Sequence, residues 1–231
     1  MTKYGQYCPI ARSVEILSDR WTLLIVRDLL GGKHHFNELE RGLPGIPRAL
    51  LADRLRHLQR VGVLERQVEA NGQKTRYQLT QSGQELSQVI EALTHWGAKW
   101  AFGEPDTSEL DPILLLWWMR DRVYMDLLPR RRVVVEFKFQ GPRRYTYWLV
   151  LQPTDVSICL THPGFEVDVL VTAELAALYK VWLGRITFAE AVREQQVDLN
   201  AAPSLVRNFP RWFAWSPVAE AVRAERNHKK Q

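Results

Sequence analysis

The chain has 231 residues, of which 46% are hydrophobic and 25% are charged, the balance of an ordinary globular protein. Its longest apolar run is shorter than the roughly 18 to 20 residues needed to span a bilayer, and its first seven residues lack the apolar segment of a signal peptide. We therefore expect a cytoplasmic protein without a membrane span, and the net charge of +5, concentrated in residues 1–103, agrees with a polyanionic partner.

Two amphipathic helices are predicted near the start of the chain. Apolar side chains recur at helical spacing in two sets, Ile10, Val14 and Leu17, and then Trp21, Leu24, Ile25 and Leu29. Gly31 and Gly32 are expected to end the second helix, because glycine readily adopts the backbone conformation that stops one. Cys8 and Cys159 lie far apart, and a structural disulfide between them is not expected in the cytoplasm.

A helix-turn-helix is predicted over residues 35–61. Apolar side chains repeat at helical spacing in two short segments, first Phe36, Leu39 and Leu43, then Leu51, Leu55 and Leu58. Pro44 and Gly45 lie between the segments and cannot continue a helix, so the chain must turn there. Pro47 suits the first position of the second helix, where its missing N–H is not needed. Two short helices joined by a tight turn are the helix-turn-helix pattern.

The second helix of this pattern has a basic polar face. With its leucines turned inward, a step of about 100° per residue places four residues on the opposite side, Ala49, Asp53, Arg56 and Arg60. Arg48 and Arg54 flank that face. Arginine suits phosphates and guanine edges, because its planar guanidinium donates two parallel hydrogen bonds. A solvated helix face carries similar charges, so charge alone does not decide between the two interpretations.

A β-hairpin is predicted directly after this helix. Residues 63–69 and 75–79 have alternating patterns, and Asn71-Gly72 between them is typical of a type I′ turn, which requires positive φ at both central residues. Lys74 and Arg76 lie beside the tip, within reach of a neighbouring DNA backbone or minor groove. An ordinary exposed hairpin with basic residues is the alternative. Taken together, the two helices and the hairpin indicate a winged helix.

A further helix follows the hairpin. Thr80 or Ser82 is a candidate cap for it, and its apolar stripe extends to about Trp100. The stripe consists of Leu86, Val89, Ile90, Leu93 and Trp96.

Residues 7–100 resemble the HxlR family of bacterial winged-helix transcriptional regulators. The motifs that carry the resemblance occur in order: Cys8-Pro9, RWTLLI at 20–25, FNEL at 36–39, LPGI at 43–46, Arg54-Leu55, GVL at 62–64, YQLT at 77–80 and Trp96. The resemblance implies a homodimer that the first and last helices of the domain hold together. It also implies pseudo-palindromic operator DNA, with the two recognition helices in major grooves about 34 Å apart.

Residue roles carried over from the family give a predicted DNA interface. The start of the recognition helix is expected to face the groove through Pro47, Arg48, Ala49 and Asp53. Arg54, Arg56 and Arg60 are expected to contact the DNA backbone or bases, and Lys74 and Arg76 to act from the wing. Arg54 has an alternative role, an ion pair with a core carboxylate such as Glu38.

Cys8 matches the N-terminal cysteine of the family. The resemblance implies that this thiol can act as a switch that senses oxidants or electrophiles, as it does in some members. The thiolate is the reactive form of such a cysteine. Lys3 and Arg12 lie nearby in the sequence. The alternative is a small buried hydrophobic residue at the dimer interface, which is common for a free cysteine.

A second domain is predicted over residues 104–231, after a first domain of residues 1–103. Residues 102–108 are a turn-rich linker, and Asp111-Pro112 is a typical helix start. Residues 113–127 are apolar almost all round, which predicts a helix covered on several sides. The triplet Arg130, Arg131 and Arg132 is interpreted as a loop or strand-edge cluster rather than a nucleic-acid site.

The rest of the second domain predicts an α+β layer fold with about five strands. Strands are expected at 133–139, 145–151, 156–160, 167–171 and 197–199, and helices at 173–183, 187–194 and 203–213. The segment that ends in Lys229 and Lys230 is expected to be a frayed polar tail.

The second domain resembles the sterol carrier protein-like domains found behind such regulators, over residues 110–218. Residues 181–191 and 205–212 carry the resemblance. It implies an apolar cavity between the sheet and the helices, suited to a fatty acid, a sterol or an isoprenoid-like molecule. The lining candidates are Trp117, Trp118, Met119, Tyr124, Phe137, Phe139, Trp148, Tyr179 and Trp182. The same aromatic side chains also suit a plain hydrophobic core.

These features favour a homodimeric DNA-binding regulator whose operator binding responds to an apolar small molecule in the second domain. The alternatives are a thiol-based redox or electrophile sensor acting through Cys8, and a lipid-binding protein whose winged helix only dimerises. An enzyme, a metal site and a cofactor are not expected: the six histidines have no metal-ligand spacing, and no nucleophile elbow, phosphate loop or Cys-x-x-Cys occurs. His34 and His35 are expected to point apart on a helix.

Overall fold

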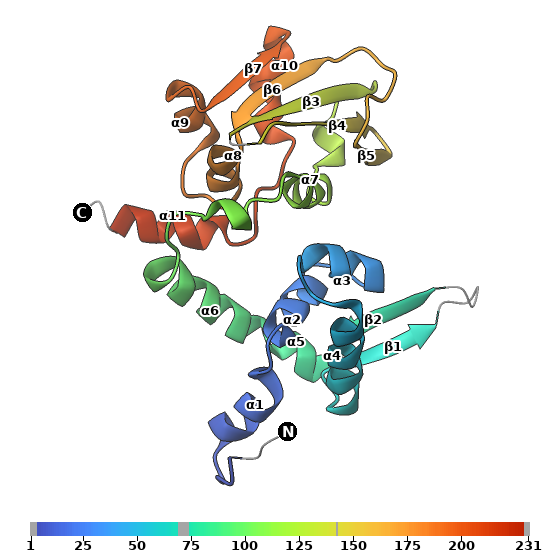
Figure 1. Cartoon of the computed structure of the whole chain (residues 1–231), viewed down its shortest axis with the longest axis vertical. Coiled ribbons are helices and arrows are strands. Elements are labelled where there is room, and N and C mark those ends of the chain that lie inside the picture. The colour runs from blue at the N-terminus through green and yellow to red at the C-terminus, as the bar shows by residue number, and fades with distance from the viewer. Residues whose placement is uncertain (1–3, 69–73, 142, 229–231) are drawn as a thin grey trace. The chain divides into compact units, whose positions relative to one another are not determined.

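The computed structural model describes residues 4–68, 74–141 and 143–228 (Figure 1). The chain divides into two compact units, Met1–Leu93 and Thr94–Gln231. The division falls within helix α6 (Ser87–Trp100). The functional boundary expected after residue 103 stays a prediction. Among the described residues, no helix is both long enough and apolar enough to cross a membrane.

The first unit is a winged helix-turn-helix. Its elements are α1 (Pro9–Leu17), α2 (Thr22–Leu30), α3 (Phe36–Gly42), α4 (Arg48–Arg60), β1 (Leu64–Val68), β2 (Thr75–Leu79), α5 (Gln81–Glu85) and the first part of α6. β1 and β2 pair antiparallel, from Leu64 opposite Leu79 to Val68 opposite Thr75. The predicted turn at Asn71-Gly72 lies outside the described residues. Thr80 is the N-cap of α5, because its hydroxyl accepts a hydrogen bond from the Gly83 N–H.

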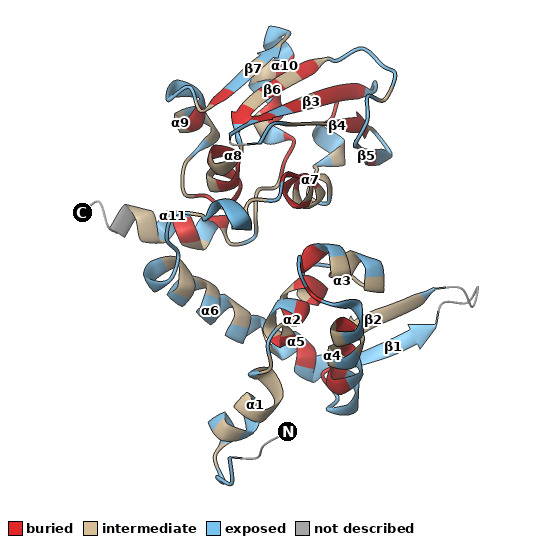
Figure 2. Ribbon diagram, in the orientation of Figure 1, coloured by how far each residue is buried: buried red, intermediate tan, exposed pale blue. Residues whose placement is uncertain are grey.

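The core of the first unit is built by the leucines that the helical spacing singled out. Leu39, Leu51, Leu55 and Leu58 are fully buried together with Ile25 of α2, and Figure 2 shows these buried faces meeting inside the unit. The periodicity of about 3.6 residues per turn therefore placed these side chains on inward faces, as predicted.

A buried carboxylate holds the corner between α2 and α3. Asp28 is almost fully buried and accepts hydrogen bonds from Lys33 Nζ and Arg27 Nε, each at 3.0 Å. Gly42, the last residue of α3, packs directly on this carboxylate, and any Cβ at that position would overlap Asp28 and Lys33. The absence of a side chain at Gly42 thus allows the close approach that orients the helix-turn-helix.

The second unit contains one five-stranded sheet in the order β5–β4–β3–β6–β7. The strands are β3 (Val133–Gln140), β4 (Tyr145–Gln152), β5 (Asp155–Cys159), β6 (Val169–Glu174) and β7 (Val197–Ala201). Its helices are η1 (Thr107–Glu109), α7 (Pro112–Arg120), η2 (Met125–Leu127), α8 (Leu175–Trp182), α9 (Phe188–Arg193), α10 (Pro203–Asn208), η3 (Phe209–Arg211) and α11 (Ala219–His228). Neighbouring strands are antiparallel except β3 and β6, which are parallel. The predicted α+β fold with five strands is confirmed.

The strand register decides which face of this sheet carries the core. Val135 pairs with Leu149 and Val169, and Phe137 pairs with Tyr147 and Val171, so the odd-numbered residues share one face. These side chains form one hydrophobic cluster with residues from α7, α8 and α10. The helices therefore cover this face, as the buried residues in Figure 2 indicate.

The predicted helix over residues 113–127 is wrong beyond Arg120. Asp111 caps α7 as expected, accepting the N–H groups of Ile113 and Leu114. After α7, the Tyr124 N–H donates to the Trp212 carbonyl at 2.8 Å, and the Ala214 N–H donates to the Arg122 carbonyl at 2.8 Å. These backbone bonds to a distant segment replace the helical ones, so after a turn at residues 121–122 the chain is extended at residues 123–124.

The C-terminal segment also differs from the prediction. The helix expected over 203–213 ends as α10 at Asn208 and continues only as the 3-10 turn η3, because Pro210 lacks an N–H and disfavours a continued α-helix. The expected polar tail is instead the helix α11, in which Ala219 and Val222 are buried and Arg226 forms an ion pair with Glu190 at 2.6 Å. Lys229 and Lys230 lie outside the described residues.

Candidate nucleic-acid interface

Helix α4 presents the predicted polar face to solvent. Ala49, Asp53, Arg56 and Arg60 are all exposed, while the leucines on the opposite side are fully buried. The helix begins at Arg48, with Pro47 as its N-cap residue, one position later than expected. The groove-facing residues predicted from the family therefore share one accessible surface. Their contacts with DNA stay a prediction.

Two of the arginines on this surface already have acidic neighbours. Arg48 forms an ion pair with Glu40 and stacks over the Phe36 ring, with its guanidinium carbon 4.9 Å from the ring centroid. Arg56 forms an ion pair with Asp53, one helical turn before it. Both arginines remain mostly exposed. Exposed ion pairs of this kind contribute about 0–1 kcal/mol, so a phosphate can displace the carboxylates at little cost.

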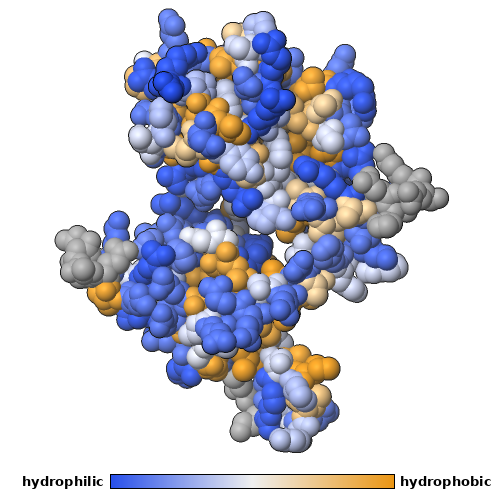
Figure 3. Space-filling model, turned by 180° about the vertical axis from the view of Figure 1, so that it is seen from behind, coloured by the Kyte–Doolittle hydropathy of each residue, from blue (hydrophilic) through white to orange (hydrophobic). Residues whose placement is uncertain are grey.

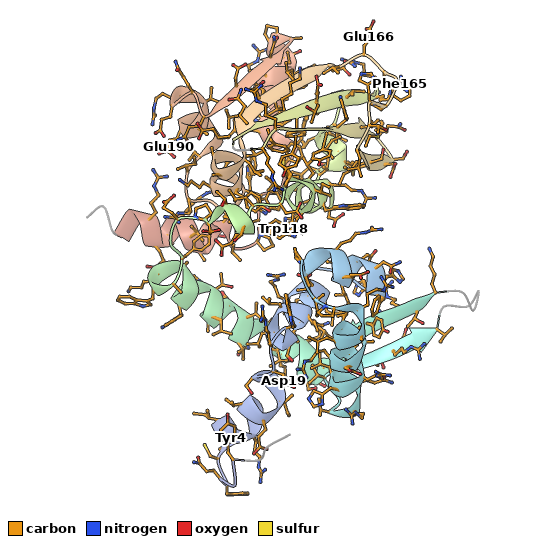
Figure 4. The ribbon with its side chains drawn as sticks, in the orientation of Figure 1. Tyr4, Asp19, Trp118, Phe165, Glu166 and Glu190 are labelled. Carbon is orange, nitrogen blue, oxygen red and sulfur yellow. The ribbon has the colours of Figure 1, made fainter. Side chains whose placement is uncertain are left out.

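Arg54 is held inside the first unit. Its Nη1 lies 2.5 Å from Asp19 Oδ2, and its side chain is only 22% exposed. Asp19 lies in the corner between α1 and α2, where Figure 4 labels it. The ion pair predicted as the alternative role of Arg54 is therefore present, but its partner is Asp19. Glu38, the partner given as an example, accepts backbone N–H groups instead.

A surface groove of about 920 Å³ runs along the C-terminal half of α4. Its walls are formed mainly by Arg54, Arg56, His57, Arg60, Asp19 and Asp53. His57 was not among the predicted site residues. It is 9% exposed, and its Nε2 has no hydrogen-bond partner among the described residues. Its position beside Arg56 and one turn after Arg54 was the available sequence signal.

Two histidines hold the wing against the segment that precedes α3. His34 and His35 precede α3 rather than lying on a helix, so the expectation that they point apart on one is wrong. Their Nδ1 atoms lie 3.1 Å from the carbonyls of Tyr77 and Thr75 respectively. A carbonyl can only accept, so both Nδ1 atoms donate. The Tyr77 N–H also donates to the His34 carbonyl at 2.8 Å, which adds this segment to the edge of β2.

Glu38 fixes the same segment from the other side. Its Oε2 accepts the backbone N–H groups of His34 and His35, each at 2.9 Å. Burial acts to raise the pKa of Glu38, but these hydrogen bonds outweigh it and hold the pKa below its usual value. The carboxylate therefore stays ionised at neutral pH and positions the root of the wing, where Lys74 is exposed and Arg76 half-buried.

Removal of the charge at Asp19 tests the role of the Arg54 pair. Asp19→Asn is expected to tighten binding to an arbitrary duplex by about threefold to fivefold at low salt, because one negative charge leaves the groove and Arg54 is released. Fluorescence anisotropy with a labelled random duplex measures this effect at two salt concentrations. Asp155→Asn, on β5 of the second unit, is the matched control. Weaker binding of the Asp19 variant would show instead that the ion pair is needed to hold α4 in place.

The ligand-lining candidates of the second unit do not all lie on one side of the sheet. Phe137 and Phe139 lie on the core-facing side of the sheet, whereas Trp148 lies on the other side against His162, with ring centroids 5.5 Å apart. Met119 and Trp182 are buried core residues, and Trp118 meets the Tyr179 ring edge-on at 6.0 Å. Trp117 stacks under Arg120, and Tyr124 is exposed. A role in ligand binding for these nine residues stays a prediction.

The two cysteines are free and lie in different units. Cys8 is the N-cap residue of α1 and is half-buried. Cys159 ends β5. Within the described ranges, no group of three or more histidine, cysteine or acidic side chains is arranged to hold a metal ion.

A helix-turn-helix with an exposed arginine-bearing second helix, followed by a two-stranded wing, defines the winged-helix DNA-binding proteins. A family model described as HxlR-like helix-turn-helix matches residues 16–104. The chain belongs to this family of helix-turn-helix-type transcriptional regulators.

Two sequence relatives agree with this assignment. The helix-turn-helix-type transcriptional regulator YvaP of Bacillus subtilis (strain 168) is 35% identical over 109 residues, which cover 46% of this chain and 97% of YvaP. Rv3095 of Mycobacterium tuberculosis (strain ATCC 25618 / H37Rv), a regulator of the same named type, is 39% identical over 89 residues, 38% of this chain and 56% of Rv3095. The chain thus spans just over half of this mycobacterial relative. The solved reduced form of the transcriptional regulator YodB from B. subtilis is 32% identical over 41% of this chain and 95% of YodB, with a TM-score of 0.37.

Proposed function

We propose that this regulator binds operator DNA as a homodimer, and that an apolar small molecule in the second unit modulates the binding. The observation that carries the proposal is the exposed arginine face of α4 in a chain of this family. Pro47, Arg48 and Ala49 enter the major groove at the start of α4, and Arg56 and Arg60 reach bases or phosphates further along it. Arginine at such positions binds guanine or phosphate with two parallel hydrogen bonds.

A second copy of the chain is the partner that best suits α6. The described helix has no buried residue, yet Val89, Leu93, Trp96 and Trp100 recur on it at helical spacing. The two tryptophans are 60% and 68% exposed. Large exposed apolar stripes of this kind indicate interaction sites. Ile10 of α1 is also exposed, and Figure 3 shows hydrophobic side chains on the surface of α1. These observations support dimerisation through the first and last helices of the winged-helix domain.

The second unit is proposed to be a sterol carrier protein-like ligand domain. Its support is a five-stranded sheet with helices on one face and an interior rich in aromatic rings. An effector regulates DNA binding only if it binds the two DNA-binding states with different affinity, typically by 1–3 kcal/mol. Helix α6 continues through the boundary between the units, so a change in the second unit reaches the proposed dimer helix along the chain itself.

Selection from a pool of random duplexes tests this function. The expected product is a pseudo-palindrome whose half-sites lie about 10 base pairs apart, since a two-fold dimer places its recognition helices one helical turn apart.

Native mass spectrometry of the purified protein is expected to give the mass of a dimer and to reveal any co-purified apolar molecule. A protein that is strictly monomeric, or that selects no sequence, contradicts the proposal. A dimer that binds lipid without selecting DNA supports the alternative of a lipid-binding protein.

Cys8 supports a second mode of regulation, through the thiol. It lies at the N-cap of α1, a proposed dimer helix, and is only partly buried, so a reagent can reach it. Modification there would alter the dimer contact. Exposure to a small quinone is expected to release wild-type protein from DNA in a mobility-shift assay and to leave the Cys8→Ser variant bound. Equal release of both proteins excludes this mode, and Cys159→Ser is the control.

A further inference from the structure

The second unit has a small groove between η2 and α10, and none of the residues that line it is among the nine predicted lining residues. Its volume is about 380 Å³, within the range typical of small-molecule sites. The side chains that give it its character are Leu127, Leu205 and Trp212, which are apolar, and Arg131, Ser204 and Asn208, which are polar. We propose that this groove binds a small molecule with a single carboxylate on a short apolar body.

Long-range backbone contacts build the groove. The hydrogen bond from the Tyr124 N–H to the Trp212 carbonyl fixes the segment before η2 against the segment after η3. Because Pro210 prevents α10 from continuing as an α-helix, the chain turns and brings Trp212 under the groove. Part of the wall is therefore set by the packed core.

The floor of the groove suits an apolar body. Leu128, Leu205 and Trp212 are buried in the core of the unit, whereas Leu127 beside them is 50% exposed. A ligand with an apolar chain covers Leu127 and removes its surface from water, which is the main driving force for apolar association.

The polar groups of the groove select the ligand's charge. None of the residues that line it is acidic. Arg131 is 59% exposed, and its hydrogen bonds to the Arg132 carbonyl and to Asp168 both use Nη1. Its Nε and Nη2 have no partner among the described residues, so one edge of the guanidinium is available to a carboxylate. A cation finds no such partner here.

One residue that lines the groove also carries a buried donor without an acceptor. The indole N–H of Trp212 is buried, and no described residue accepts its hydrogen bond. A buried donor left in this state is unfavourable. Because this nitrogen is closed off from solvent, the carboxylate of a ligand in the groove is assigned to Arg131 and not to the indole. The groove thus combines an apolar floor with a partly free arginine edge and no acidic side chain, and this set matches a monocarboxylate.

This inference depends on the proposed ligand-responsive function only for its regulatory consequence. Octanoate binding to the full chain is measured by calorimetry with no DNA present, so a failure here and a failure of operator binding are separate results. Octanoate is expected to bind at least about tenfold more tightly than octanamide, which has the same shape without the charge. Arg131→Gln is expected to weaken octanoate binding about tenfold or more. Arg130→Gln, the same change at the neighbouring residue outside the groove, is expected to change it less than twofold.

Two further measurements locate the bound molecule. In spectra of ¹⁵N-labelled indoles, the Trp212 resonance, assigned by its loss in Trp212→Phe, is expected to shift when octanoate is added, because Trp212 lines the groove. Ser204→Phe fills the groove from an exposed position and is expected to abolish binding without changing the thermal midpoint, which covers the case in which Trp212→Phe does not fold. The proposal is overturned if octanoate does not bind, if Arg131→Gln and Arg130→Gln behave alike, or if a different indole responds while Trp212 does not.

Discussion

The variant Arg56→Ala/Arg60→Ala is expected to bind the selected operator about 100-fold more weakly than the wild-type protein. Both side chains are exposed on the solvent side of α4, and neither contributes to the core. Each arginine that binds a base edge or phosphate is worth about 1–3 kcal/mol, so removal of both side chains corresponds to this factor or more. The salt dependence of binding is also expected to become shallower, by about one unit of slope for each phosphate that the variant no longer neutralises. Anisotropy titrations at several salt concentrations measure both effects.

A matched pair of substitutions in the second unit separates a local effect from a general effect of charge. Arg193 on α9 and Arg223 on α11 are exposed, so Arg193→Ala/Arg223→Ala removes the same net charge far along the chain from α4. We expect this control to change operator affinity by less than about threefold, because both side chains belong to the second unit and no DNA contact is proposed for them. If both double variants lose affinity equally, or if neither does, α4 is not the DNA-binding element.

Phe209→Ala is expected to destabilise the second unit by about 3–5 kcal/mol, the usual cost of removing a buried phenylalanine ring. Phe209 is fully buried, and its ring contacts four other rings, those of Phe137, Phe188, Trp212 and Phe213. Its loss leaves a cavity between the sheet and the segment that forms the floor of the groove. Urea unfolding followed by tryptophan fluorescence measures the change.

The control for this prediction is Phe165→Ala. Phe165 lies in the loop before β6, is 38% exposed and stacks with Arg132, so its removal is expected to cost about 1 kcal/mol or less. The winged-helix unit has its own core and is expected to keep its unfolding midpoint in both variants. A destabilisation below about 1 kcal/mol for Phe209→Ala would contradict the central position that the structure assigns to this ring.

Local patterns predicted the winged helix in detail. The turn at Pro44-Gly45 and the leucine spacing on either side of it led directly to α3 and α4, and the exposed face of α4 is the predicted one. Similarly, Asp111-Pro112 was readable as a helix start, because the capping side chain of Asp111 bonds to N–H groups only two or three residues away. Interactions within one turn of helix are encoded within one short stretch of sequence.

Predictions failed where distant segments compete with local preference. Residues 113–127 are apolar enough for one long helix, yet α7 ends at Arg120 because residues 122–124 bond to 212–214. The tail that reads as polar is helical because Glu190, in another helix, holds Arg226. Burial and pairing partners that lie tens of residues away leave no periodic signal in the segment itself.

The sequence by itself determined the class of this protein: a helix-turn-helix, a wing and an arginine-bearing helix, followed by an α+β unit with five strands. All of these depend on periodicity, turn residues and caps, which act over a few residues. Only the tertiary structure decided that Asp19 holds Arg54, that His34 and His35 anchor the wing, and that Trp212 lies beneath a groove with Arg131 at its edge. These arrangements depend on the strand order and on backbone bonds between remote segments, because only the folded chain brings such residues within hydrogen-bonding distance.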